Sequence, residues 1–375
     1  MPFAVRGRSI SPPAARSSVA SGTATTTRRR VRAIFFPLAA ATLGLLFAVA
    51  IAEIALRARS LAPSQAISTV TESEFRRVPG IFGPGQRIVD RQIAALPFAV
   101  QIDSLGYRGV GFPVQKRPGE LRILAIGDSF TYGDFVDNDS TFPAVLQRDL
   151  AASCGRPVTV INAGVGGSTI TTAIHMLDRA WRLSPDVVLL TFVENDVDDL
   201  RNDMWGELTS NRQAKSKFPL SVIYPVLRRS ALWNFSLKLR GRIRAVGYSA
   251  LPSDPADLRP RSDVPRLRAE YGRVLHALAS EVRKRDRSLV LVAFPSHLTV
   301  SGITTDEQLQ WLERTGRDQD VPTFNLLEPF KASGLPTTTL YLLPHDGHPS
   351  PRGYEVAGSW LTSRLAALRI CQTPE

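Results

Sequence analysis

The stretch Leu121-Arg-Ile-Leu-Ala-Ile-Gly-Asp-Ser-Phe-Thr-Tyr-Gly133 decides how the rest of the chain is interpreted. Its opening residues are almost wholly apolar, which is typical of a buried strand, and the run stops abruptly at Gly-Asp-Ser. A serine after such a strand lies at the carboxyl edge of the sheet, where open α/β folds bind ligands. Ser129 is therefore a candidate nucleophile; the alternative is a serine that only caps the next helix.

Strand-like and helix-like segments alternate on the C-terminal side of this stretch. Near-continuous apolar strands separated by helices indicate a parallel sheet covered on both faces. We therefore predict a three-layer α/β fold. The predicted strands are residues 121–126, 158–161, 187–192, 289–294 and, more weakly, 323–326, and the predicted helices are 142–153, 170–183, 264–285, 305–315 and 352–370.

Charge is distributed unevenly over the 375 residues, whose formal net charge is +12. Residues 1–32 hold seven arginines and no acid, while residues 200–262 hold twelve lysines or arginines against four acids. The rest of the chain is slightly acidic. This distribution argues against a nucleic-acid-binding protein.

A segment near the N-terminus is long and apolar enough to cross a membrane. Residues 33–52 contain no charged side chain, and arginines crowd their N-terminal side. We expect a transmembrane helix over 33–56, a disordered basic cytoplasmic tail over 1–32, and an exported remainder. A cleaved secretory signal and a twin-arginine signal at residues 28–30 are alternatives, and both also export the C-terminal part.

The exported part is expected to contain an extension and a main domain. Residues 57–115 predict an extension laid on the main domain, which spans 116–375. Residues 197–262 interrupt the strand–helix rhythm as an insertion, with apolar residues at helical spacing from Ile223 to Val246 and basic residues between them. We interpret this as a helical insertion with a solvated basic face; a membrane-surface contact and a ledge for an anionic glycan are alternatives.

Only two cysteines occur, Cys154 and Cys371, and each follows a predicted helix. If those two helices lie parallel on one face of the sheet, their C-terminal ends meet. In an oxidising compartment the pair would then form a disulfide. Two unbridged, half-buried cysteines are the alternative.

Three later segments follow predicted strands or precede the last helix. They are a glycine-rich loop at residues 162–168, Val193-Glu-Asn-Asp196 after the third strand, and His345-Asp-Gly-His-Pro-Ser-Pro351. Carboxyl ends of parallel strands share one sheet edge, so these segments should converge on Ser129.

This order of blocks resembles the SGNH/GDSL hydrolase family over residues 120–200 and 286–370. The resemblance implies a flavodoxin-like sheet, Ser129 as nucleophile, His348 as base and Asp346 as its orienting acid. It further implies an oxyanion hole made by the backbone N–H groups of Ser129 and Gly164 and the side chain of Asn195, with no cofactor and no metal. Two positions depart from the usual pattern: Val193 replaces a glycine, and His345 stands where many members have the acid, which makes it a rival base.

Residues 107–109, Tyr-Arg-Gly, also resemble a feature of membrane-anchored bacterial members of this family. Whether Arg108 contacts substrate or braces the extension stays open. Asp128 is expected to form local hydrogen bonds only.

The function implied is a membrane-tethered serine esterase of the bacterial inner membrane, with its catalytic domain in the periplasm. It would hydrolyse acyl, preferably O-acetyl, esters on a carbohydrate, an envelope polymer or a small molecule. An O-acyltransferase with the same residues is one alternative, because a sugar hydroxyl can replace water at the acyl-enzyme. A non-catalytic glycan-binding or assembly protein is the other. The expected partners are the ester substrate and, through residues 33–56, the membrane, and no nucleic acid.

Overall fold

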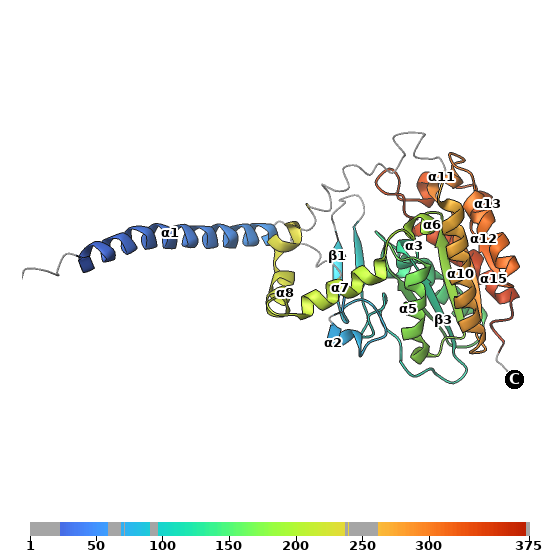
Figure 1. Ribbon diagram of the computed structural model, residues 1–375. Coiled ribbons are helices and arrows are strands. Elements are labelled where there is room, and N and C mark those ends of the chain that lie inside the picture. Colours follow the sequence, from blue (N-terminus) through green and yellow to red (C-terminus); the bar gives the residue numbers. More distant parts are fainter. Residues whose placement is uncertain are drawn as a thin grey trace, which may run out of the picture. The chain divides into compact units, whose positions relative to one another are not determined.

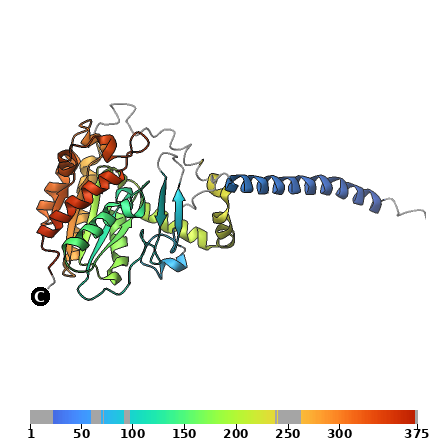
Figure 2. The ribbon, with the colours of Figure 1, turned by 180° about the vertical axis from the view of Figure 1, so that it is seen from behind.

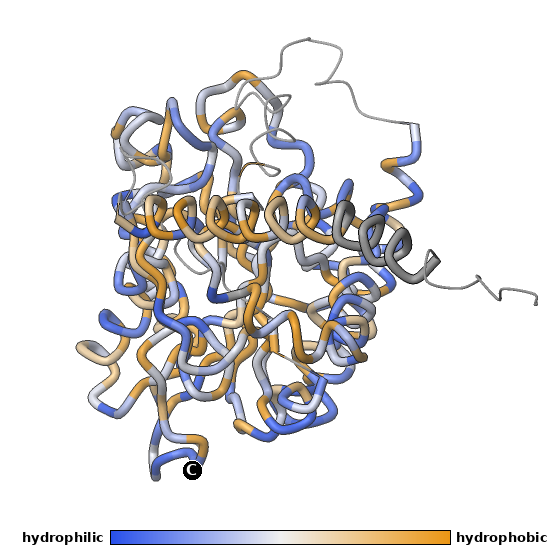
Figure 3. Tube along the Cα trace, turned by 90° about the vertical axis from the view of Figure 1, so that its left-hand side faces the viewer, coloured by the Kyte–Doolittle hydropathy of each residue, from blue (hydrophilic) through white to orange (hydrophobic). Residues whose placement is uncertain are grey.

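The computed structural model describes residues 23–58, 69–70, 72–90, 97–236, 239 and 262–372. The chain forms two compact units, Met1–Ala55 and Leu56–Glu375. Helix α1 (Thr23–Ala58) includes the segment Phe35–Ala58, which by length and composition could cross a membrane. Figure 3 shows that this helix is predominantly hydrophobic.

The tail prediction needs correction where the structure describes it. Residues 1–22 lie outside the described residues, but α1 begins at Thr23, so residues 23–32 are helical rather than disordered. A helix propagates at little cost once it has formed. No proline or glycine interrupts the chain between Thr23 and Pro37, so the membrane-type helix extends into the basic segment.

The second unit is built on a five-stranded parallel sheet (Figure 1). Its strand order is β4-β3-β5-β6-β7, the flavodoxin-like order in which the first strand of the sheet is flanked by the second and third. All five predicted strands are confirmed: β3 (Leu121–Gly127), β4 (Val158–Gly164), β5 (Val187–Val193), β6 (Ser288–Phe294) and β7 (Thr323–Asn325).

Helices cover both faces of this sheet, so the three-layer prediction is confirmed. Alternate residues of β3 point to opposite sides, with Leu124 and Ile126 in one buried cluster and Ile123 and Ala125 in another. α5 and α10 lie in front of the sheet in Figure 1, and the red α15 lies in front of it in the opposite view of Figure 2. The first layer comprises α5 (Ile170–Ala180), α10 (Val264–Arg283) and α12 (Glu307–Asp318), and the second comprises α4 (Phe142–Ser153), α13 (Leu327–Ala332) and α15 (Pro351–Ala367).

The described part of the 57–115 extension packs against the main domain. It contains α2 (Glu72–Phe75) and an antiparallel pair, β1 (Arg87–Asp90) and β2 (Phe98–Gln101). Arginines of the main domain hold it by donating to its main-chain carbonyls: Arg179 donates to Phe75, and the fully buried Arg122 donates to Pro113. Arg108 of the extension also forms an isolated β-bridge with Asn162 of β4, so the extension is an integral part of this unit.

The insertion is helical, but its helix is not continuous. It contains α6 (Asp196–Asp199), α7 (Met204–Ser216) and α8 (Leu220–Arg229), and residues 231–236 are again helical. Ser230 adopts an extended conformation, with ψ of 127°, and so breaks the single helix predicted from Ile223 onward. The remainder of the predicted helix, from residue 240 to Val246, lies outside the described residues.

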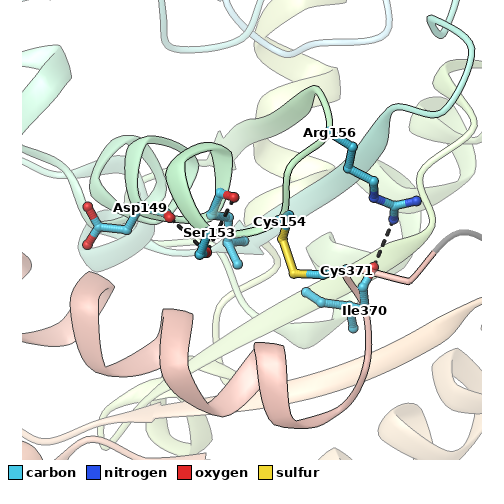
Figure 4. The surroundings of a disulfide bond; sticks show 7 residues. Asp149, Ser153, Cys154, Arg156, Ile370 and Cys371 are labelled. Carbon is cyan, nitrogen blue, oxygen red and sulfur yellow. Dashed lines mark hydrogen bonds between the residues drawn. A yellow bond between two sulfur atoms is a disulfide. The ribbon is translucent and has the colours of Figure 1, made fainter.

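Cys154 and Cys371 are joined by a disulfide with a Cα–Cα distance of 5.0 Å (Figure 4). Cys154 caps the C-terminal end of α4, and Cys371 follows α15. The two helices pack side by side on one face of the sheet. Arg156 adds a second tie by donating to the Ile370 carbonyl at 2.8 Å.

Candidate active site

Ser129 stands at the first position of the short helix α3 (Ser129–Tyr132), directly after β3. Asp128 caps this helix: its Oδ1 accepts the Phe130 N–H at 2.9 Å. The Ser129 Oγ lies 2.8 Å from His348 Nε2. Strand end and cap thus hold the hydroxyl at the carboxyl edge of the sheet, beside the imidazole.

Asp346 holds the other side of the imidazole. Its Oδ1 lies 2.5 Å from His348 Nδ1 and also accepts the His348 backbone N–H at 2.8 Å. A carboxylate acceptor fixes the proton on Nδ1, which leaves the Nε2 lone pair for the Ser129 hydroxyl. His348, rather than the rival His345, therefore makes the contact with Ser129.

The loop carrying Asp346 and His348 is tied at both ends. The Leu342 N–H donates to the His348 carbonyl, and the Ser350 N–H donates to the Leu340 carbonyl, both at 2.9 Å. Ser350 also caps α15 by accepting the Gly353 N–H at 3.1 Å, and proline follows at the first helical position. This cap fixes the imidazole relative to the sheet.

The charges around the imidazole favour its protonated form. Burial alone would lower the pKa of His348, but the hydrogen bond to Asp346 and the charges of Asp134, Asp346 and Asp128 outweigh it, so the pKa is raised. Burial likewise opposes ionisation of Asp346, yet its hydrogen bond with His348 leaves its pKa below the ordinary value. Burial, only partly offset by the Phe130 N–H and His348, raises the pKa of Asp128 to about 6.

The N–H of Gly164, which was predicted to donate to the oxyanion, is already bonded within the protein. Its N–H donates to Asn162 Oδ1 at 3.0 Å. A Cβ at this position would lie only 2.1 Å from the Tyr132 backbone nitrogen. Glycine is thus needed here for the close approach of α3 to β4.

Gly166 lies beside the nucleophile. A Cβ built on it would lie 3.9 Å from the Ser129 Cβ. Among hydrogen bonds between described residues, neither the Gly166 N–H nor the Ser129 N–H donates to a protein acceptor. Both donors are therefore available at this edge of the sheet.

Asn195 is exposed and lies two residues after the end of β5. Its Nδ2 donates to Asp199 Oδ2 at 2.7 Å. The neighbouring acids have partners as well: Glu194 accepts the Ser296 N–H, and Asp196 accepts the Val193 N–H.

Arg108 braces the loop that follows the nucleophile, which answers the question left open by the sequence. Its side chain is buried, and its guanidinium donates to the carbonyls of Tyr132 at 2.7 Å and Val136 at 2.5 Å. Its Nε donates to Asn138 Oδ1 at 3.0 Å. The Tyr-Arg-Gly motif of residues 107–109 was the only sequence signal for this contact.

The braced loop places two further side chains beside His348 that sequence reasoning missed. Asp134 Oδ2 lies 3.9 Å from His348 Nε2. The Phe135 ring meets the imidazole edge to face, with centroids 5.7 Å apart, and Phe135 has a φ of +63°. Asp134 follows Ser129 by five residues with no pattern that sets it apart from other loop acids.

Residues 125–356 match the GDSL-like Lipase/Acylhydrolase family. A search of curated proteins gave no match. Among solved structures, the chain is similar to the acetylxylan esterase Axe2 from Geobacillus stearothermophilus, with 15% identity, a TM-score of 0.37, and coverage of 68% of this chain and 95% of that one.

Two further solved structures are similar at the same level. For the psychrotrophic esterase EstA from Pseudoalteromonas sp., identity is 14%, the TM-score 0.39, and coverage 66% and 98%. For CEX, a two-domain esterase active on acetylated mannans, identity is 15%, the TM-score 0.41, and coverage 69% and 53%. Since these scores are low, the family assignment rests on the match over residues 125–356.

Proposed function

The chain belongs to the GDSL-like lipase/acylhydrolase family and is an ester-hydrolysing enzyme, and on that premise we propose that Ser129, His348 and Asp346 form its catalytic triad. The observation that carries this proposal is the continuous hydrogen-bonded series from the Ser129 hydroxyl through His348 to Asp346, at 2.8 and 2.5 Å. Nucleophile, base and orienting acid in this geometry are the arrangement that acyl transfer to serine requires.

In the proposed mechanism, Ser129 Oγ attacks the ester carbonyl carbon while its proton passes to His348 Nε2. The resulting imidazolium is stabilised by Asp346. Collapse of the tetrahedral intermediate breaks the bond to the alcohol, which takes the Nε2 proton and leaves. Water then attacks the acyl-enzyme with His348 again as base, which releases the carboxylic acid and restores Ser129.

The tetrahedral oxyanion needs donors that are in place beforehand. We propose the Ser129 N–H, the Gly166 N–H and the Asn195 side chain for this role. The amide of Asn195 carries two hydrogens, so donation of one to Asp199 leaves the other for substrate. Gly166 takes the place first predicted for Gly164, because the Gly164 N–H already donates to Asn162. Asn195→Ala should lower kcat about a hundredfold or more.

The proposed substrate is an acyl ester, preferably an O-acetyl ester, of an extracytoplasmic carbohydrate. Two features support an exported, membrane-tethered enzyme. The segment Phe35–Ala58 could cross a membrane, and the Cys154–Cys371 disulfide fits an oxidising compartment. We propose that the N-terminus is cytoplasmic and the catalytic domain periplasmic, in keeping with the arginines that precede the apolar segment.

Labelling with a fluorophosphonate probe tests the triad directly. The full chain in detergent micelles should be labelled, and the Ser129→Ala variant should not. Labelling that persists in Ser129→Ala, or an unlabelled wild-type protein, would overturn the assignment. Release of free acetate from acetylated glycans, against transfer of acetyl to an added sugar, separates hydrolysis from transfer.

A further inference from the structure

Asp134 lies beside the proposed triad and has no part in the mechanism above. Its Oδ2 is 3.9 Å from His348 Nε2, the nitrogen that exchanges the proton with Ser129 and the leaving alcohol. Its side chain is 36% exposed, and burial of the carboxyl raises the pKa of Asp134 above the ordinary value. Within the described residues, its side chain makes no other ion pair or hydrogen bond.

The position of Asp134 directs it toward the alcohol half of a substrate. The leaving oxygen must come within about 3 Å of His348 Nε2 to receive the proton. Because Asp134 Oδ2 is 3.9 Å from that same nitrogen, the leaving oxygen cannot lie farther than about 7 Å from the carboxylate. Substituents of the alcohol that extend to this side of His348 Nε2 therefore come within reach of the Asp134 carboxylate.

The carboxylate is held in this place by the residues on either side of it. The Arg108 guanidinium donates to the Gly133 carbonyl at 2.5 Å, before Asp134, and to the Val136 carbonyl, after it. Arg108 is only 4% exposed and comes from the extension. A clamp on both sides of Asp134 restricts where its side chain can reach.

The charges that face the imidazole here are acidic. They belong to Asp346, Asp134 and Asp128. The guanidinium of Arg108 is occupied by main-chain carbonyls, and no other lysine or arginine in the described part of the chain bonds to Ser129, His348 or Asp134. A negatively charged alcohol would enter against this field without a counter-ion.

We propose that Asp134 is a specificity-determining residue of the alcohol subsite. It accepts hydrogen bonds from hydroxyl or ammonium groups of the leaving alcohol, and it repels anionic alcohols. The substrate class is then an acyl ester of a neutral polyol or an amino sugar, rather than of a uronate or a phosphorylated sugar. This inference rests on the proposed esterase function.

Three acetate esters of matched shape test the proposal on the full chain in detergent micelles at about pH 8, where carboxylates are ordinarily ionised. They are 4-acetoxybenzamidinium, 4-acetoxybenzamide and 4-acetoxybenzoate, which carry a cation, no charge and an anion on the leaving phenol. We expect kcat/KM to fall in that order. Asp134→Asn should lower the preference for the amide over the benzoate on the order of tenfold, as expected for a like charge roughly 6 Å away in a partly solvated site.

Two matched variants serve as controls. Asp134→Glu keeps the charge and should retain the preference. Because the preference is a ratio of two kcat/KM values of one variant, an inactive unfolded fraction of Asp134→Asn would not change it. Asp139→Asn removes an exposed carboxylate from the same segment and should leave the preference as in wild type.

The outcomes separate this inference from the function on which it rests. A preference in Asp134→Asn within about twofold of the wild-type value, with the neutral ester still turned over, overturns the role of Asp134 alone. No turnover of any of the three esters by wild type, or equal turnover by Ser129→Ala, overturns the esterase proposal and the Asp134 inference with it.

Discussion

Replacing Arg108 with lysine tests whether the extension controls the geometry of the site. The guanidinium donates to three main-chain carbonyls and to Asn138 Oδ1. Lysine keeps the charge but has no planar fork, so it can satisfy only part of this set. If two buried carbonyls lose their donor, at roughly 1–3 kcal/mol each, the free energy of unfolding should fall by about 2–6 kcal/mol.

The same substitution should change the pH dependence of catalysis. His348 acts as a base only when neutral, so kcat/KM falls as the pH drops through its pKa. Asp134 is among the groups that raise this pKa. Loosening the loop with Arg108→Lys moves the carboxylate away from the imidazole, which lowers the pKa and shifts the acid limb of the profile to lower pH. Asp134→Asn should shift it in the same direction.

The assay is kcat/KM against pH for wild type, Arg108→Lys, Asp134→Asn and the double variant, with urea unfolding of each. If Arg108 acts through the position of Asp134, the double variant shows no larger shift than Asp134→Asn alone. Shifts that add in the double variant would refute this route. An unchanged profile in a destabilised Arg108→Lys protein would leave Arg108 a purely structural role.

Three further outcomes follow from the described contacts. Asp346→Asn should lower kcat on the order of 10⁴-fold, because the proton is no longer fixed on His348 Nδ1. It should also move the acid limb of the kcat/KM profile to lower pH, and a limb moved to higher pH would contradict the assignment. Gly164→Ala should push Tyr132 and α3 away from β4, which should lower the free energy of unfolding in urea by about 1–3 kcal/mol or more. Because α3 carries the nucleophile, kcat should fall as well, and an unchanged kcat would refute the packing role. Cys154→Ala removes a disulfide whose cysteines are 217 residues apart, so the free energy of unfolding should fall by up to about 5 kcal/mol. Reductant should give the same loss in the wild-type protein, and an equal melting temperature of wild type with and without reductant would speak against the bond.

The order of strands and helices could be predicted because its signals are local. Each core strand is an apolar run short enough to identify directly, and Ser350-Pro351 marks the start of α15 by side-chain capping and a fixed φ. The continuous helix predicted from Ile223 failed at Ser230, where periodicity continues although the backbone is extended. Periodicity reports which side chains are apolar and not whether adjacent turns share one axis.

The site residues likewise differ in how far local sequence signals predict them. Ser129 and Asn195 lie close to strand ends, and the topology of a parallel sheet alone brings such positions to one edge. His348 lies in the loop before α15, where the Ser350-Pro351 signal marks its place in the sequence. The choice between Gly164 and Gly166 depends on which N–H is already bonded, which is a property of the folded loop.

The roles of Asp134 and Arg108 are harder to predict from the sequence, because neither residue lies at the end of a strand. Their roles arise only where the extension crosses the loop after the nucleophile, and Arg108 donates there to backbone carbonyls that every residue type possesses. Because Arg108 donates to backbone carbonyls, the loop needs no particular residue type to accept these bonds, and its sequence gives no sign of them. If Asp134 sets the preference for the alcohol as proposed, the segment that supplies Arg108 acts on that preference through the position of the loop, and deletion of residues 97–115 should alter substrate preference together with stability.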